Sequence, residues 1–309
     1  KEYANEKGVS IIGDMPIYVA LDSADVWAEP QWFLLDEKNV PIDISGVPPD
    51  YFNEDGQLWN NPLYRWDAIE RDGFGWWIRR VEGAFKLCDA LRIDHFRGLE
   101  SYWAVPYGAT TAKKGRWVKA PGAALLKVLT SWFYEHMFIA EDLGMLTPEV
   151  YRLREDAGLP GMTVLQFAFD WRSLSTYLPH TLERNSICYT GTHDNNTLCG
   201  WLDSADKKEL AFAAEYLGLN EEEGYHWGVI RGGMGSVADL FIAQMQDYLG
   251  LGAEARISVP GIAGGNWRWR MKPDSERIGL KAPVFLTYLP SRGDNAESAD
   301  NSINGNFPD

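Results

Sequence analysis

Three short segments of the sequence each lead from an apolar run into a carboxylate. They are residues 90–97 (ALRIDHFR), 138–144 (FIAEDLG) and 189–195 (YTGTHDN), and their acids are Asp94, Glu141 and Asp194. If each run is a strand in a barrel of parallel strands, the acids meet at the mouth formed by the C-terminal strand ends, where active sites of such barrels lie. Three carboxylates at one mouth, one of them beside an arginine, suggest acid/base and nucleophilic chemistry on a sugar.

The surroundings of two of these acids predict different protonation states. Arg92 and Asp94 point to the same face of a strand, and a neighbouring guanidinium lowers the pKa of a carboxyl, which suits an ionised nucleophile. Glu141 follows an apolar run that could raise its pKa and keep it protonated as an acid. Two carboxylates about 5 Å apart define a retaining glycosidase-type site, and a third can stabilise positive charge on the sugar.

Each acid also has a purely structural explanation, which taken singly is the better one. Asp94 and Arg92 could form a structural ion pair, Glu141 could lie in a solvated turn, and Asp194 could cap a helix. Three strand-end acids in parallel α/β order favour a site when they are taken together. The same three acids could alternatively hold Mg²⁺, as in barrels of the enolase type, although Arg92 would oppose a second cation.

Composition narrows the class of protein. The chain has 309 residues, of which 45% are hydrophobic, and a formal net charge of −15, which argues against nucleic-acid binding. No apolar run approaches the roughly 18 residues that span a membrane, and the polar opening run is unlike a secretory signal. The odd number of cysteines, without a CxxC pair, indicates free thiols in a reducing compartment: Cys88, Cys188 and Cys199.

Helix and strand patterns alternate along most of the chain and predict a parallel α/β fold. Residues 20–72 lack clear periodicity and are too long for an ordinary connection, so we interpret them as an inserted lid or small subdomain. Residues 291–309 are polar and predict a disordered tail, which leaves residues 1–290 as the catalytic domain. We predict strands at 9–12, before Asp94, before Glu141, and at 162–169, 187–190 and 257–259. We predict helices at 1–8, 75–88, 125–133, 147–158, 206–217 and 235–249.

Long motifs in the chain strongly resemble those of the 4-alpha-glucanotransferases (amylomaltases or disproportionating enzymes), glycoside hydrolase family 77 of the alpha-amylase clan. The resemblance extends over about residues 1–272. The motifs are residues 13–19 (GDMPIYV), 46–52 (GVPPDYF), 56–64 (GQLWNNPLY), 92–98 (RIDHFRG), 115–119 (GRWVK), 140–144 (AEDLG) and 191–195 (GTHDN).

The resemblance implies a (β/α)8 TIM barrel that transfers segments of an α-1,4-glucan donor to the 4-OH of an acceptor glucan or glucose. Family members carry further residues on the N-terminal side, so we expect the barrel to lack its first two strands here. A glucan hydrolase on the same scaffold and an inactive glucan-binding fragment remain alternatives. The resemblance implies neither a metal nor an organic cofactor. Composition predicts no nucleic-acid or membrane partner, and the free thiols predict a cytoplasmic location, with a plastid as the alternative in a plant or alga.

The resemblance also assigns roles to particular residues. It makes Asp94 the nucleophile, Glu141 the general acid/base and Asp194 the transition-state stabiliser. The remaining matches are expected to bind the sugar. These are Asp14, Arg92, His193, the site-lining Trp59, the overhanging Tyr51 and Phe52, and Asn266 and Trp267 of a late loop.

Overall fold

The computed structural model describes residues 1–49, 53–144, 146–172, 175–262 and 264–273. Contacts divide the chain into two units, Lys1–Met271 and Lys272–Asp309. The helices and strands given below all belong to the first unit. The predicted tail at 291–309 lies outside the described residues, so the predicted domain boundary near residue 290 stays a prediction.

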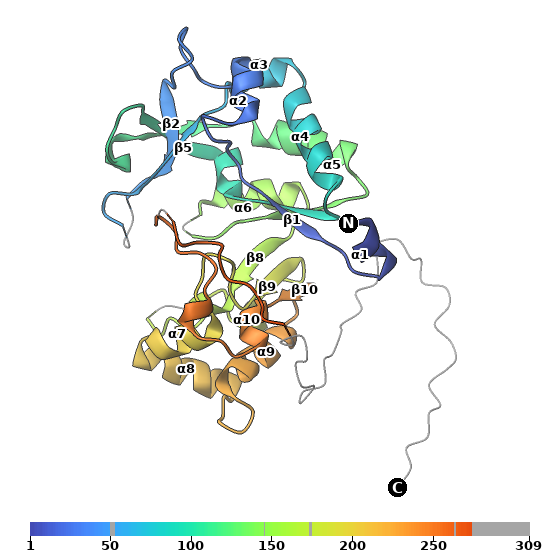
Figure 1. Ribbon diagram of the computed structural model, residues 1–309, viewed down its shortest axis with the longest axis vertical. Helices are drawn as coiled ribbons and strands as arrows, with labels where there is room; N and C mark the ends of the chain where they lie inside the picture. Colours follow the sequence, from blue (N-terminus) through green and yellow to red (C-terminus); the bar gives the residue numbers. More distant parts are fainter. Residues whose placement is uncertain (50–52, 145, 173–174, 263, 274–309) are drawn as a thin grey trace. The chain divides into compact units, whose positions relative to one another are not determined.

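Short parallel strands form the framework of the first unit (Figure 1). One parallel sheet has the order β1-β4-β7 and another has the order β10-β9-β8. The amide of Ala140 donates to the carbonyl of Pro160 at 2.9 Å and links the two sheets. The α/β class predicted from the sequence is therefore confirmed. The strands are β1 (Ile12–Met15), β4 (Ala90–Ile93), β7 (Met137–Ala140), β8 (Gly161–Val164), β9 (Ser186–Tyr189) and β10 (Leu240–Ile242).

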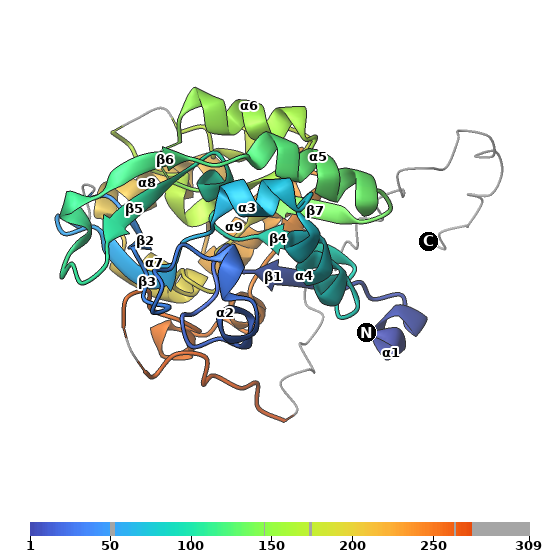
Figure 2. The same cartoon turned by 90° about the horizontal axis from the view of Figure 1, so that it is seen from above.

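Helices α4 (Gly75–Phe85) and α5 (Gly122–Trp132) pack against each other beside the first parallel sheet (Figure 2). Apolar residues of α4 recur at spacings of three and four, so that Trp77, Val81 and Phe85 all face the core and are buried. This core extends under β1, β4 and β7 and fixes the strands from which the predicted site residues project.

Residues 20–72 do not form a self-contained insertion. Their strands β2 (Asp43–Val47) and β3 (Gln57–Pro62) pair in an antiparallel sheet with β5 (Ser101–Pro106) and β6 (Arg116–Lys119), in the order β3-β2-β5-β6. Half of this sheet therefore comes from the chain that follows β4. The same region holds α2 (Ala24–Ala28) and α3 (Trp66–Arg71).

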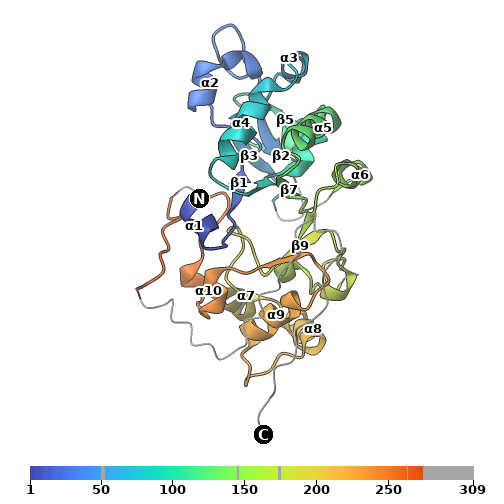
Figure 3. The ribbon, with the colours of Figure 1, turned by 90° about the vertical axis from the view of Figure 1, so that its right-hand side faces the viewer.

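A second group of helices surrounds the sheet of β8, β9 and β10, and Figure 3 shows them together. Their buried core includes Leu165, Phe169, Trp201, Leu217 and Ile230. The helices are α7 (Leu198–Ser204), α8 (Lys207–Leu217), α9 (Tyr225–Met234) and α10 (Met245–Tyr248). The predicted helix at 206–217 is confirmed by α8.

Several predicted boundaries are wrong near the C-terminal end. The predicted helix at 235–249 contains β10 followed by α10, because the apolar run at 240–242 pairs with β9 and tertiary pairing overrides helix propensity. The predicted strand at 257–259 is irregular chain. Helix α9 was not predicted because its glycines weaken the helical signal, yet Gly233 has to be small, since a Cβ there would overlap the ring of Phe241.

At the other positions the predicted elements are present with shifted ends. The first strand begins at Ile12 instead of residue 9, and the strand predicted at 162–169 ends at Val164 and continues as a 3-10 helix. Helices α1 (Glu2–Glu6) and α6 (Pro148–Asp156) lie within their predicted ranges. Across the described residues, the structure contains no helix long and apolar enough to cross a bilayer.

Candidate active site

Arg92 lies at the centre of a charged cluster on the first parallel sheet. The register places Asp14 of β1 directly beside Arg92 of β4. The guanidinium donates through Nη1 to Asp14 Oδ1 at 2.6 Å and to Asp94 Oδ1 at 3.1 Å. The Arg92 side chain is only 9% exposed, whereas the two carboxylates are 40% and 41% exposed. A buried cation therefore holds two partly exposed acids.

The pKa of Asp94 is shifted in the opposite direction to the sequence-based expectation. Burial raises its pKa above the ordinary value, and the charge of Asp14 acts in the same direction. Arg92 lowers the pKa as predicted, but burial outweighs it. The expectation of a lowered pKa is therefore wrong. The charge of Asp194 also raises the pKa of Asp94, which places these two acids within electrostatic reach of each other.

Glu141 follows β7 directly and is held by backbone amides at both carboxylate oxygens. The amide of His95 donates to Oε2 at 2.8 Å, and the amide of Leu143 donates to Oε1 at 3.1 Å. Burial raises the pKa of Glu141 to about 7 against the opposing effect of Arg92, and the negative charge of Asp94 adds to the rise. The predicted rise is confirmed, and near neutral pH such a group can both give and take a proton.

Asp194 occupies a loop beyond the end of β9. Its amide donates to Thr192 Oγ1 at 3.3 Å, and Asn195 Oδ1 accepts from the amide of Thr192 at 2.9 Å. The guanidinium of Arg256 donates to the carbonyl of Asp194. The Nε2 of His193 lies 3.5 Å from Asp194 Oδ2. The carboxylate is therefore presented by a hydrogen-bonded loop and is 48% exposed.

A buried acid that the sequence did not single out anchors this loop. Asp247 of α10 is fully buried, and it accepts hydrogen bonds from Thr190 Oγ1 at 2.6 Å and from the amide of Leu198 at 2.7 Å. These two donors flank the loop that carries Asp194. The sequence did not predict this role of Asp247. The residue was expected to lie in a long helix at 235–249, and a single aspartate in a helix does not indicate a buried anchor.

Two predicted aromatic rings contact histidines that stand next to candidate acids in the sequence. The ring of Trp59 on β3 lies edge-on to the ring of His95, with centroids 4.7 Å apart. The ring of Trp267 lies 5.0 Å from that of His193, and Trp267 is 58% exposed. His95 follows Asp94 in the chain and His193 precedes Asp194, so each ring is linked to one acid by a neighbouring histidine.

Three further residues were predicted to bind the sugar: Asn266, Tyr51 and Phe52. The Asn266 side chain bonds within its own loop, accepting from the amide of Val259 at 3.0 Å and donating to the carbonyls of Val259 and Ile262. It therefore shapes the loop that presents Trp267. Tyr51 and Phe52 lie outside the described residues.

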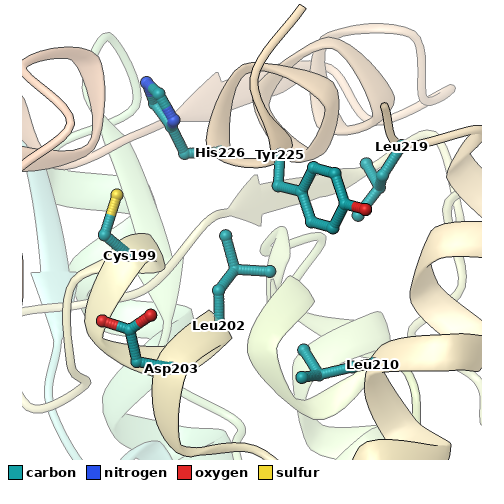
Figure 4. Close-up of a pocket in the computed structure, with 7 residues that line it drawn as sticks. All are labelled: Cys199, Leu202, Asp203, Leu210, Leu219, Tyr225 and His226. Atoms are coloured by element: carbon teal, nitrogen blue, oxygen red, sulfur yellow. The ribbon is translucent and has the colours of Figure 1, made fainter. Parts of the chain in front are cut away.

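A separate cavity of about 330 Å³ lies among α7, α8 and α9 (Figure 4). None of the predicted site residues lines it. Its lining residues are Cys199, Leu202, Asp203, Leu210, Leu219, Tyr225 and His226. Within the ranges that the structure describes, His, Cys, Asp and Glu side chains form no group of three or more arranged to hold a metal ion.

Comparisons with known proteins give a consistent picture. A family model described as 4-alpha-glucanotransferase matches residues 1–276. The 4-alpha-glucanotransferase of Clostridium butyricum is 51% identical over 295 residues, which cover 94% of this chain and 61% of that protein. The chloroplastic/amyloplastic 4-alpha-glucanotransferase of Solanum tuberosum is 49% identical over 282 residues, covering 91% of this chain and 49% of that protein.

A solved structure is similar as well. The amylomaltase from Streptococcus agalactiae in complex with acarbose matches with a TM-score of 0.86 and 41% identity, covering 89% of this chain and 56% of that one. The chain thus spans between 49% and 61% of the length of the proteins it matches.

Proposed function

The chain belongs to the 4-alpha-glucanotransferase family, and from this premise we propose that it carries the reacting carboxylates of a retaining glucan-transfer enzyme. The donor is an α-1,4-glucan such as a maltooligosaccharide or starch chain. The acceptor is the 4-OH of another glucan or of glucose.

In the proposed mechanism the reaction proceeds by two displacements at the anomeric carbon. The Asp94 carboxylate attacks this carbon while Glu141 protonates the departing glycosidic oxygen, which leaves a glycosyl ester on Asp94. Glu141, now ionised, removes the proton from the acceptor hydroxyl, and the acceptor oxygen attacks the anomeric carbon, which breaks the bond from that carbon to the Asp94 oxygen. Asp94 is released, and Glu141 is again protonated. Asp194 stabilises the positive charge that develops on the sugar ring in both transition states.

The observation that carries this proposal is the environment of Glu141. A carboxyl with a pKa of about 7 exchanges a proton readily at neutral pH, as a residue that serves first as acid and then as base must do. It is placed beside Asp94, whose charge contributes to that raised pKa. Arg92 sits 3.1 Å from Asp94 and favours its ionised form, which is the form that attacks.

We assign the remaining residues to binding of the sugar. Asp14, Arg92 and His193 hold the unit at the cleavage point, while Trp59 and Trp267 contact its apolar faces. Tyr51 and Phe52 cover the acceptor side and exclude water, so that the acceptor competes successfully for the ester. Asn266 acts through the loop it stabilises. The mechanism uses neither a metal nor an organic cofactor.

The proposal includes a fold and a location. The parallel strands would be consecutive members of a (β/α)8 barrel, and the sheet of β2, β3, β5 and β6 would stand at its mouth. Residues 1–290 would form the catalytic domain of this chain. We propose a cytoplasmic location, or a plastid for a chain from a plant or alga.

Incubation of the protein with maltotriose, with products separated by chain length, tests the transfer reaction. A ladder of longer maltooligosaccharides together with glucose supports glucan transfer. Glucose and maltose without longer products would instead indicate a hydrolase on the same scaffold. The absence of any product would contradict the activity for this chain, because maltotriose is both donor and acceptor in the proposed reaction.

A trapping experiment tests the covalent step. The substrate maltosyl fluoride has a leaving group that departs without being protonated. The variant Glu141→Gln can therefore still form the ester, but it lacks the base that the second displacement needs. We expect a glycosyl ester to accumulate on the peptide that contains Asp94, detected by mass spectrometry. The double variant Glu141→Gln, Asp94→Asn is the matched control. An ester on any other residue would refute the assignment of the nucleophile.

A further inference from the structure

His95, which follows Asp94 directly, has a left-handed backbone conformation. Its φ is 45° and its ψ is 50°, and it precedes the 3-10 helix Phe96–Leu99. Few residues other than glycine adopt this region, although His and Asn do so more readily than most, and β-branched residues rarely do. Such a conformation persists only where the surrounding structure maintains it, and it often marks a functional constraint.

The left-handed turn directs two successive amides to Glu141. The amide of His95 donates to the side-chain Oε2 at 2.8 Å, and the amide of Phe96 donates to the carbonyl of Glu141 at 3.0 Å. In the reverse direction, the amide of Glu141 donates to the carbonyl of Ile93 at 3.0 Å. The chain around Asp94 therefore fixes both the main chain and the carboxylate of the proposed proton donor.

The imidazole of His95 has a different task. Burial lowers its pKa to about 4, helped by the charge of Arg97, so the ring is neutral near pH 7. It lies edge-on to Trp59 at a centroid distance of 4.7 Å. Gly98 leaves space for it, because a Cβ there would approach His95 Cδ2 to 3.2 Å. The ring is therefore neutral near pH 7 and packs edge-on against Trp59.

We propose that His95 is a positioning residue that couples two parts of the site: its backbone orients the carboxylate of Glu141, and its ring supports the sugar-facing Trp59. The catalytic meaning of this coupling rests on the proposed function, whereas the coupling itself rests on the geometry.

Two substitutions separate the backbone role from the ring role. Asn tolerates the left-handed region, so His95→Asn retains the amide donor and loses the imidazole. Val disfavours that region strongly, so we expect His95→Val to lose the imidazole and to shift the backbone N–H away from Glu141. All three residues are uncharged near neutral pH. The charged and titratable groups that act on Glu141, namely Arg92, Asp94 and Tyr177, are unchanged in both variants, and so is the amide donor of Leu143.

The backbone role is tested by the titration of Glu141. A hydrogen bond to the ionised carboxylate lowers its pKa, so removing the bond raises it. With glutamate labelled by ¹³C at the carboxyl, and the Glu141 signal assigned by its loss in Glu141→Gln, we expect the pKa to rise by about one in His95→Val. We expect it to be unchanged in His95→Asn. If His95→Val fails to fold, as judged by circular dichroism, His95→Ala replaces it with a smaller rise in the same direction.

The ring role is tested with maltotriose. We expect KM to rise about fivefold in both variants, because a ring contact that supports Trp59 is worth roughly a tenfold change or less. The basic limb of the pH profile of kcat should move to higher pH in His95→Val alone. A purely structural role would lower stability and activity without moving that limb.

The outcomes are distinguishable from those that test the proposed function. An unshifted Glu141 pKa in His95→Val, or an equal shift in His95→Asn, would overturn the coupling. If the Glu141 signal shifts as expected but the unsubstituted protein forms no products from maltotriose, the backbone role stands and the glucan-transfer proposal fails.

Discussion

The two sides of the candidate site are built in different ways. On the strand side, defined by Asp14, Arg92, Asp94 and Glu141, two acids bracket a buried guanidinium, and Glu141 is fixed by backbone amides. On the loop side, defined by His193, Asp194 and Trp267, the side chains project from irregular chain. Loop bonds such as that from Arg256 to the Asp194 carbonyl hold them in place.

This difference suggests that the strand side carries out the reaction and that the edge of the loop side mainly binds the sugar. Burial on the strand side raises the pKa of both Asp94 and Glu141, which is useful for proton transfer but disfavours their charged forms. On the loop side the Asp194 carboxylate is 48% exposed and Trp267 is 58% exposed, so both are open to solvent. We therefore expect substitutions on the strand side to change the reaction most, and those at the edge of the loop side to change mainly sugar binding.

The largest expected effect is that of Asp94→Asn. The amide keeps the size of the side chain but cannot form the glycosyl ester, so we expect kcat/KM on maltotriose to fall at least about 10⁴-fold. The exposed Asp67, which pairs with Arg71 at 2.8 Å on α3, provides the matched control Asp67→Asn. If the activity of Asp94→Asn lies within tenfold of that of the unsubstituted protein, Asp94 is not the nucleophile.

The next largest effect is that of Asp194→Asn. Loss of one preorganised charge at the developing positive centre costs about 10²- to 10³-fold in kcat. We expect KM to change little, because the carboxylate acts mainly in the transition state. A loss as large as that of Asp94→Asn would show that the exposed loop side is as essential as the strand side.

A stability measurement tests how much the raised pKa of Glu141 lowers the free energy of unfolding. Glu141 has a folded pKa of about 7 against an ordinary value of 4.5, so the folded protein binds more protons than the unfolded chain between these values. The free energy of unfolding therefore falls as the pH rises from about 4.5 to about 7. Well above pH 7 the cost is fully present, and it amounts to roughly 3 kcal/mol.

The variant Glu141→Gln removes this titration. We expect its stability relative to the unsubstituted protein to improve by about 3 kcal/mol between pH 4.5 and pH 8, measured by urea unfolding at both values. The new side-chain amide at position 141 faces the backbone donors of His95 and Leu143 and could cost stability, but this cost is the same at both pH values and cancels when the two measurements are subtracted. A pH-independent difference between the two proteins would contradict the raised pKa.

The two sides were also unequally predictable from the sequence. Period-two alternation was enough to put Arg92 and Asp94 on one face, and the apolar run before Glu141 was enough to predict its raised pKa. The sequence did not reveal that burial outweighs Arg92 at Asp94, because burial depends on the packing of other strands. Asp14 was recognised through its motif, and the register of β1 against β4 explains its place.

The loop side depends on contacts that no local pattern encodes. Asp247 lies about fifty positions beyond Asp194 and anchors its loop through Thr190 and Leu198. The segment containing it was predicted to be one helix, and only pairing with β9 makes part of it a strand. Similarly, Asn266 was expected to face the sugar, but its amide is engaged by the backbone of its own loop. Such long-range and loop-internal bonds emerge only from the folded chain.

The smallest expected effect is that of Trp267→Ala. The indole is 58% exposed and contacts His193 at 5.0 Å, so its removal opens no cavity and should leave the free energy of unfolding almost unchanged. A lost ring contact with the sugar is worth about 1 kcal/mol, which corresponds to a rise of about fivefold in KM on maltotriose, with kcat preserved. Trp267→Phe keeps an aromatic ring, so its KM should lie between those of Trp267→Ala and the unsubstituted protein. A fall in kcat as large as that of Asp194→Asn would mean that Trp267 positions the reacting groups through His193. In that case the loop side would act as a single catalytic unit, and its difference from the strand side would lie in how it is built and not in what it does.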